Sequence, residues 1–254
     1  MSHDLREKMA TWPGHTKYDF NVDVRGIAPG KDFYLELNSL HLSEHVSTHM
    51  DAPAHFAKGK WHVDQIPTQN IVGAGVVVDI SDKAFKDPDA EVTVDDLTKW
   101  EETYGRIPDR AFVFMNSGWE HRWNNITAFL GNDKENTTGF HFPGFHPAAT
   151  KWLVDNRDIM AIGVDSISLD NARTNDHGTH RYAMGHNVMG FEMVANLSRV
   201  PPRGSTIYAL PMKVHDGSGA PVRILAVLNG AANLNSGLFM PLTMILCSLL
   251  EYLD

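Results

Sequence analysis

The chain is poor in the features that mark several large classes of protein. It has a single cysteine, Cys247, in 254 residues, so no intramolecular disulfide can form. Lysine and arginine number 22 against 31 aspartate and glutamate residues, and the basic residues form no run or stripe. Nucleic acids and anionic membrane surfaces are therefore not expected as partners. No Gly-, Ser- or Pro-rich linker divides the chain, which predicts one domain over residues 1–230.

Long hydrophobic runs are also scarce. The first six residues lack the apolar core of a signal peptide, so the compartment stays open between cytoplasmic and secreted. Residues 231–254 form an apolar tail, whose stretch from Leu238 to Tyr252 is too short and too polar at its end for a membrane span. We expect this tail to form a helix docked on the body or on a partner. The alternative is a lipid-anchor signal that processing removes.

What the chain does contain is an alternation of apolar strands and helices. Strands are predicted where β-branched and apolar residues cluster, over residues 33–42, 71–80, 111–115, 159–164, 206–210 and 222–228. Helices are predicted over residues 94–104, capped by Thr93 and ended by Gly105, and from Pro147 to about residue 155. Residues 12–30 and 120–145 are interpreted as loops. Strands and helices that alternate without strict βαβ regularity predict an α/β domain with a mixed sheet.

The segment from His45 to His55 holds three histidines and one aspartate at odd-numbered positions: His45, His49, Asp51 and His55. In an extended strand the side chains alternate between two faces, so these four would project the same way. A helix would spread them round its axis, and Pro53 also opposes a helix. We therefore predict an extended segment that directs four metal-binding or proton-handling groups into one space.

Imidazole and carboxylate groups grouped in this way suit a divalent metal. Such a metal lowers the pKa of a bound water to about 7 and polarises a carbonyl group. His45, His49 and Asp51 can form the ligand set, and His55 can carry the proton, because the imidazole pKa lies near neutrality. Spacing alone leaves a second interpretation open, a solvated histidine-rich strand in a chain with 14 histidines.

This segment resembles the signature of the metal-dependent cyclase family, which includes bacterial kynurenine formamidase and isatin hydrolase. The family pattern is His-x-Gly-Thr-His-x-Asp-Ala-Pro-x-His, and this chain departs from it at Ser47, where the family usually has glycine. Serine there should cost some backbone freedom without removing a ligand. Further matches are Trp12-Pro13-Gly14, Trp61 to Pro67, Ser117-Gly118-Trp119, Phe142-Pro143-Gly144 and Gly163 to Ser166.

The resemblance implies a single α/β domain with a mixed β-sheet flanked by helices, and it implies a second half to the site. In formamidase-like members a distant His and Glu, twelve residues apart, complete the ligands, and here they are His180 and Glu192. The resemblance selects His180 over His177 and His186, a choice that spacing alone does not make. It implies two divalent metals per chain, zinc or manganese, with Asp51 as the bridging ligand.

The activity that the resemblance implies is hydrolysis of a small-molecule amide, either an aryl formamide such as N-formylkynurenine or a cyclic amide, in a homodimer or larger homo-oligomer. Trp12 would form an aromatic wall of the pocket, unless it is an ordinary core tryptophan. One alternative is a one-metal isatin or lactam hydrolase, a type that lacks the glutamate found here as Glu192. The other is a catalytically silent metal-binding member, based on Ser47 and on Met193, which replaces an asparagine of the family pattern.

Overall fold

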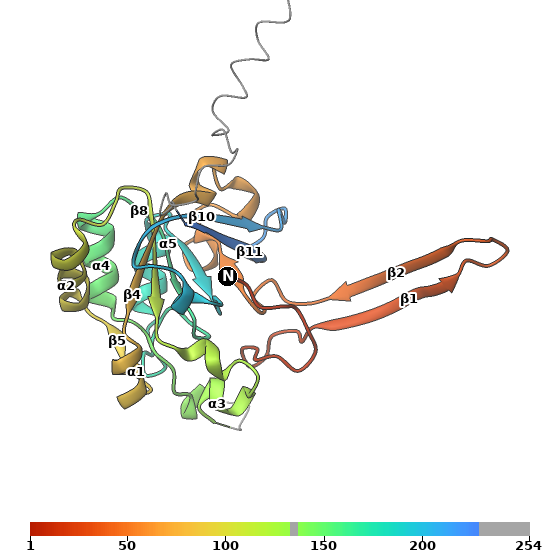
Figure 1. Ribbon diagram of the computed structural model, residues 1–254, viewed down its shortest axis with the longest axis horizontal. Helices are drawn as coiled ribbons and strands as arrows, with labels where there is room; N and C mark the ends of the chain where they lie inside the picture. The colour runs from red at the N-terminus through yellow and green to blue at the C-terminus, as the bar shows by residue number, and fades with distance from the viewer. Residues whose placement is uncertain (133–136, 229–254) are drawn as a thin grey trace, which may run out of the picture.

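The computed structural model describes residues 1–132 and 137–228, and seven of the strands in these residues close into one barrel-like sheet (Figure 1). The order round the sheet is β10-β11-β3-β9-β8-β6-β4, and β4 pairs again with β10. These strands are β3 (His49–Asp51), β4 (Val72–Asp79), β6 (Ala111–Asn116), β8 (Ile159–Val164), β9 (Met189–Glu192), β10 (Arg203–Pro211) and β11 (Gly219–Leu228). A small separate sheet pairs β5 (Glu91–Val92) with β7 (Gly144–Phe145).

The closed sheet is mixed, as the sequence predicts. The strands β4, β6, β8 and β9 pair in parallel along the order β4-β6-β8-β9, whereas β3, β10 and β11 pair antiparallel with their neighbours. All six predicted strands are present, and five of them belong to this sheet. The sequence does not predict closure, because closure depends on which edge strands meet. The strand β10 provides it by pairing with β11 on one side and with β4 on the other.

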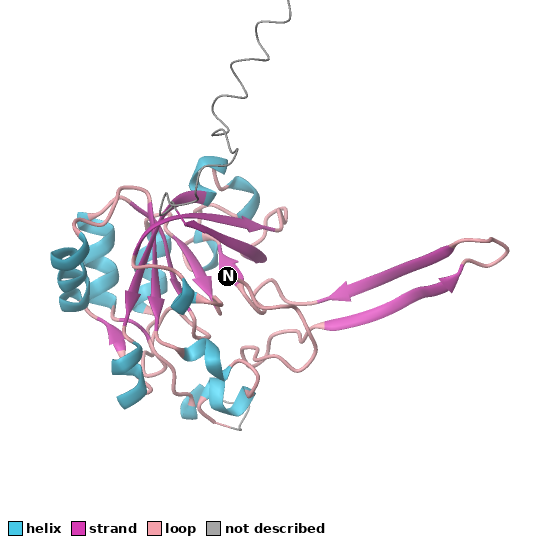
Figure 2. Ribbon diagram, in the orientation of Figure 1, coloured by secondary structure: helices cyan, strands magenta, loops and turns pink. Residues whose placement is uncertain are grey.

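The helices connect the strands, and two of them, α2 and α4, cover the outer face of the sheet (Figure 2). The α-helices in the described residues are α1 (Ser81–Lys86), α2 (Val94–Tyr104), α3 (Ile126–Leu130), α4 (Pro147–Asn156) and α5 (Gly178–Gly185). Short 3-10 helices are η1 (Pro53–His55), η2 (Val63–Gln65), η3 (Thr68–Ile71), η4 (Trp119–Arg122), η5 (Thr137–Gly139) and η6 (Leu197–Arg199). The predictions of α2 and α4 are confirmed, since Thr93 accepts a hydrogen bond from the backbone of Asp96 and Gly105 ends α2.

Successive residues of the central strands enter two different cores, because side chains alternate between the faces of a sheet. In β6, Phe112 and Phe114 pack with other strand residues inside the barrel. Val113 and Met115 pack on the other face, under α2 and α4, against side chains that include Leu97. A strand buried on both faces reads as a continuous apolar run, which is why the sequence identifies these strands well.

Two predicted loops are wrong. Residues 12–30 contain β1 (Asp19–Ile27), which pairs with β2 (Tyr34–His41) as a long two-stranded arm projecting from the body (Figure 1). Polar residues alternate with the apolar residues of β1, so its apolar content is too low to stand out as a strand. Residues 120–145 contain α3, and the aromatic side chains of Trp123, Phe129 and Phe140 are buried. Because polar residues separate these aromatics along the chain, the sequence does not reveal the local core that they form.

The expected docked helix over residues 231–254 lies outside the described residues, and the division of the chain at residue 230 stays a prediction. Among the residues that the structure does describe, no helix combines the length and the apolar character that crossing a membrane requires.

One buried carboxylate joins the ends of two neighbouring strands. Asp165, directly after β8, accepts hydrogen bonds from the backbone nitrogen of Ser117 at 3.1 Å, the Ser117 hydroxyl at 2.5 Å and the backbone nitrogen of Trp119 at 2.8 Å. Ser117 and Trp119 follow β6, the neighbour of β8. Burial outweighs these donors and raises the pKa of Asp165 to about 6.

Changing Asp165 to asparagine is expected to alter how the free energy of unfolding depends on pH. The pKa rises from 3.8 to about 6 on folding, so the native state binds more protons in this window and wild-type stability falls as pH rises through it. Relative to Asp165→Asn, wild type should lose about 2 kcal/mol between pH 4 and pH 6.5. Urea unfolding at several pH values measures this difference, and parallel curves for the two proteins would contradict it.

Candidate active site

The strand β3 carries two of the predicted site residues on one face. Met50 packs inside the barrel, so its neighbours His49 and Asp51 point to the opposite face. Both side chains are buried. The strand is only three residues long, but it pairs with β9 on one side and β11 on the other, which together hold it in register.

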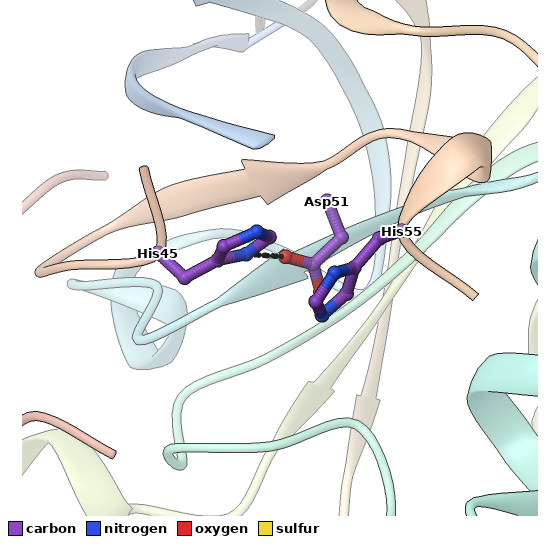
Figure 3. Close-up of side chains that lie close together, drawn as sticks. All are labelled: His45, Asp51 and His55. Atoms are coloured by element: carbon purple, nitrogen blue, oxygen red, sulfur yellow. Dashed lines mark hydrogen bonds and ion pairs between the residues drawn. The ribbon is translucent and has the colours of Figure 1, made fainter. Parts of the chain in front are cut away.

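The prediction of one extended segment is wrong outside β3. His45 precedes the strand in a bend, and Ser47 has a left-handed backbone with a φ of 52°. His55 ends the 3-10 helix η1, which begins with Pro53. The groups nevertheless converge: His45 Nδ1 lies 2.7 Å from Asp51 Oδ1, and the rings of His45 and His55 stack with their centroids 4.0 Å apart (Figure 3). Turns on both sides of the strand, rather than strand parity, bring the outer histidines together.

Glycines on both neighbouring strands make room for Asp51. Its register partners are Gly190 of β9 and Gly219 of β11. A Cβ atom at Gly190 would lie 3.1 Å from Asp51 Oδ2, and one at Gly219 would lie 2.5 Å from Cε1 of His45. A side chain at either position would enter the site, so close approach of the backbone requires glycine there.

The two distant residues, His180 and Glu192, reach the same carboxylate. His180 lies in α5, and Glu192 ends β9 opposite His49. His180 Nε2 lies 3.1 Å from Glu192 Oε1 and 3.5 Å from Asp51 Oδ2. His49 Nε2 lies 3.2 Å from Asp51 Oδ1 and 3.4 Å from Glu192 Oε2. Together with His45, the structure therefore brings the other four predicted ligands around the Asp51 carboxylate.

Sequence reasoning missed Asp170, which orients His180. Its Oδ2 atom is hydrogen-bonded to Nδ1 of His180, and its Oδ1 atom accepts a hydrogen bond from the backbone nitrogen of Thr179 at 2.8 Å. This leaves His180 Nε2 facing Asp51 and Glu192. A carboxylate behind a ligating imidazole fixes its tautomer and its ring orientation. No spacing rule links Asp170 to His180, because the loop between them has no regular period.

The charges of the site depend on one another. Burial disfavours a charge on His49, but Asp51 and Glu192 outweigh it and raise its pKa to about 10. The pKa of His180 is also raised by neighbouring carboxylates against the effect of burial. In return, the imidazoles hold the pKa of Asp51 well below its usual range although it is buried. His55 differs, since burial lowers its pKa to about 4 and its ring is neutral at neutral pH.

Two buried polar atoms fit a metal ion. Nε2 of His49 and Oδ2 of Asp51 make no hydrogen bond to any described residue. Unpaired buried polar atoms are costly, and a cation between them would satisfy both. Asp51 belongs to two groups whose ligand atoms lie within 4.8 Å of one another, one with His45 and His55 and one with His49 and Glu192. Nitrogen and oxygen donors of this kind suit zinc or manganese.

A cavity of about 190 Å³ opens onto these groups. Its lining residues are Trp12, His15, His45, His49, His55, Phe56, Ile167, Ser168, His177, His180, Glu192 and Met193. Trp12 also contacts Phe140 and Phe142 edge-on, with ring centroids 5.8 and 6.4 Å apart. Trp12 therefore both lines the cavity and packs against an aromatic core cluster.

The two histidines that were not selected as ligands have different surroundings. His186 is exposed, and its Nδ1 atom lies 2.8 Å from the carbonyl oxygen of Tyr182. His177 lines the cavity, has a φ of 50° and places its ring 5.2 Å from Phe56. Its Nδ1 atom has no hydrogen-bond partner in the described part of the chain. His177 is therefore a cavity residue that the sequence pattern leaves without a role.

Comparisons with known proteins agree with this geometry. The family model described as "Putative cyclase" matches residues 1–171. Isatin hydrolase from Roseibium aggregatum is 32% identical over 199 residues, which cover 75% of this chain and 74% of that protein. A kynurenine formamidase from Salinibacter ruber is 25% identical over 233 residues, which cover 91% of this chain and 96% of that protein.

The fold is shared as well. The structure of isatin hydrolase A from Ralstonia solanacearum superposes with a TM-score of 0.80 at 32% identity, and the match covers 89% of each chain. The sequence similarity, the closed mixed sheet and the convergence on Asp51 agree with the resemblance found in the segment from His45 to His55. The chain therefore belongs to the cyclase family of hydrolases, together with isatin hydrolase and kynurenine formamidase.

Proposed function

We propose that this protein is a divalent-metal-dependent amidohydrolase that cleaves a C–N bond in a small amide attached to an aromatic ring. The observation that carries the proposal is the meeting of His45, His49 and His180 with Asp51 and Glu192 beside an aromatic-walled cavity. The buried atoms of His49 and Asp51 that lack a hydrogen bond to the described residues support a metal there. We expect two ions of zinc or manganese per chain.

In this proposal His45, His49 and Asp51 hold one ion, and Asp51, His180 and Glu192 hold the other. Divalent ions in such a site lower the pKa of water and polarise an amide carbonyl. The chain prepares the ligands: the Ser47 carbonyl oxygen lies 2.9 Å from His49 Nδ1, which leaves Nε2 facing the site. Nδ1 of His45 is the candidate ligand atom, because its Nε2 lies 3.0 Å from the Ser218 hydroxyl.

His55 is the proposed proton carrier. Its ring lines the cavity, stacks on His45 and lies 6.2 Å from the ring of His180, measured between centroids. Its imidazole is neutral at neutral pH and can accept a proton from the attacking water and return it to the leaving nitrogen. Burial makes it a weaker base than the free imidazole, with a pKa near neutrality, on which the sequence prediction relied. Trp12 and Phe56 offer aromatic surfaces against which a planar substrate ring can pack.

Two kinds of amide are candidates. The 32% identity to isatin hydrolase supports a cyclic amide, whereas the presence of Glu192 beside His180 supports a formamidase-like site with two metals. Among the described residues, no lysine or arginine lines the cavity, which favours a substrate without a carboxylate tail. A panel of isatin, a cyclic imide and N-formylkynurenine, tested on metal-loaded protein with EDTA as control, decides between them. Failure on every substrate would instead support a catalytically silent metal-binding protein.

Replacing Glu192 with alanine is expected to lower the bound metal from two equivalents toward one. Glu192 contacts His49 and His180, so its loss removes a ligand from the second ion and leaves His45 and Asp51 in place. Metal analysis after dialysis measures the stoichiometry. Glu102→Ala, at an exposed position of α2, is the matched control and should keep the wild-type content. An unchanged metal content in the Glu192 variant would disprove the two-metal arrangement.

A further inference from the structure

A second cavity of about 410 Å³ lies beside the catalytic cavity, and the two share Trp12, Ser168 and His177 among their lining residues. These three side chains therefore form the boundary between the two spaces. The catalytic cavity, at about 190 Å³, is smaller than a typical small-molecule site, which occupies about 300 to 1,000 Å³. The two cavities together fall within that range. The space beside the proposed metal site can therefore hold more than the reacting amide and its ring.

One wall of the second cavity is the loop of residues 165–177, which connects β8 to α5. Hydrogen bonds hold this loop in place. The backbone nitrogen of Leu169 donates to Glu192 Oε1 at 3.0 Å, so the loop is attached to a proposed metal ligand. Asn171 folds the chain back on itself, because its Oδ1 atom accepts a hydrogen bond from the backbone nitrogen of Arg173 at 2.8 Å. The second cavity therefore has a formed wall that is continuous with the catalytic site.

His177, at the boundary of the two cavities, has a polar atom without a partner. Its Nδ1 atom is buried and makes no hydrogen bond to any described residue. Its backbone has a φ of 50°, a left-handed conformation that few residues other than glycine adopt. Such strained conformations persist where the surrounding structure imposes them, and they cluster at active sites and ligand contacts. A ligand atom that hydrogen-bonds to Nδ1 of His177 would remove the cost of leaving it unpaired.

The polar side chains of the second cavity favour an uncharged ligand group. The lining includes the uncharged polar residues Asn171, Thr174 and Asn175. It also includes Arg173, whose Nε atom lies 2.8 Å from Asp89 Oδ2, and Asp170, which is hydrogen-bonded to His180. A carboxylate would therefore meet no unpaired lysine or arginine among the described lining residues. Amide and hydroxyl groups, in contrast, would meet both hydrogen-bond donors and acceptors.

We propose that the second cavity is part of the substrate site and takes an uncharged, hydrogen-bonding substituent of the substrate's aromatic ring, with Nδ1 of His177 as its first contact. The ring itself packs against Trp12 and Phe56 in the catalytic cavity, and the substituent extends past His177 into the second space. The inference rests on the proposed function, because it names the class of amide that the same site binds best. That class is an aryl amide whose ring carries a short side chain ending in an amide or a hydroxyl group.

A series of formanilides tests the substrate class. The ring is unsubstituted or carries a propanamide, a propanoate or an isopentyl chain, each as the ortho, meta and para isomers. For at least one isomer, the propanamide is expected to have a kcat/KM about 10-fold or more above that of formanilide, mainly through a lower KM. The isopentyl chain matches its size without hydrogen-bonding groups, and the propanoate adds a charge. Both should react less efficiently than the propanamide of the same isomer, and a propanoate or isopentyl compound that equals it would overturn the inference.

Two variants place the substituent in the second cavity. Thr174 lines this cavity and not the catalytic one, so Thr174→Trp reduces the space for the substituent and should abolish the preference for propanamide over formanilide. Thr103→Trp is the matched control and should keep the preference, since Thr103 is exposed on α2 and lines neither cavity. His177→Phe keeps a ring but removes the nitrogen atoms. It should lower the preference by about 3- to 10-fold while the bound metal stays unchanged.

The preference is a ratio measured with two substrates on one sample, so partial misfolding of a variant lowers both rates and leaves the ratio unchanged. If no formanilide is hydrolysed, the proposed function fails. Calorimetric titration of the same intact compounds then measures the preference as a ratio of dissociation constants. A wild type that neither cleaves nor binds any propanamide isomer better than formanilide would overturn the inference. So would a Thr174→Trp protein that keeps the preference, or a His177→Phe protein that loses its metal, because His177 would then be a ligand.

Discussion

Replacing His55 with alanine is expected to slow hydrolysis by about 10²- to 10⁴-fold while the bound metal stays unchanged. His55 lines the cavity and stacks on His45, and burial keeps its imidazole neutral. Its removal takes away the proposed proton carrier but leaves the groups around Asp51 and Glu192 in place. Steady-state kinetics on the best substrate of the panel, with metal analysis of the same sample, measures both quantities.

The matched control for this experiment is His186→Ala. His186 is exposed directly after α5 and does not line the cavity, so its loss should change neither turnover nor metal content. Near-normal turnover in His55→Ala would refute the proton-carrier role. Loss of metal together with activity would show that His55 is a ligand, which its closeness to His45 and Asp51 allows.

Local features of the fold could be predicted well. The helix α2 begins and ends where the sequence predicts. Thr93 with Asp96 marks its start and Gly105 its end, and each of these signals acts within one turn of the helix. The buried strand β6 was clear from its unbroken apolar run. The strand β1 was not, because polar residues separate its apolar ones and it has no unbroken apolar run.

The site shows the same division between local and distant information. His49 and Asp51 share a face because they are two residues apart in a strand. His180 and Glu192 lie far along the chain, and only the family resemblance selected them, because no local rule predicts that α5 and β9 meet β3. Asp170 was missed for the same reason. Its contact with His180 follows from the path of a loop, which sequence periodicity does not describe.

The two departures from the family pattern occupy the same kind of backbone. Ser47 has a φ of 52° and Met193 a φ of 53°, a left-handed region that glycine and asparagine adopt more readily than serine or methionine. Hydrogen bonds offset the strain: the Ser47 hydroxyl donates to the carbonyl of Asp4 at 3.1 Å, and the backbone nitrogen of Met193 donates to the carbonyl of Ser166 at 2.9 Å. Neither departure displaces Asp51 or its neighbours, so both remain compatible with the proposed activity.

Replacing Asp51 with asparagine is expected to have the largest effect of any single change at the site. The Oδ1 atom of Asp51 contacts His45 and His49, and its Oδ2 atom faces His180, so this one carboxylate joins both proposed ion sites. Asparagine keeps the size of the side chain but loses the charge and one acceptor atom. We expect almost no bound metal. The loss of turnover should exceed that of His55→Ala, for which we expect a loss of about 10²- to 10⁴-fold.

Thermal unfolding separates this loss of metal from misfolding of the Asp51→Asn protein. An ion that binds only the native state raises Tm, so added zinc or manganese should raise the Tm of wild type and leave that of Asp51→Asn unchanged. Asp109→Asn, at an exposed position away from the cavity, should respond to metal as wild type does. If Asp51→Asn still binds two equivalents and its Tm still rises with metal, Asp51 does not bridge the ions. The imidazoles of His49 and His180 would then belong to sites that bind metal independently.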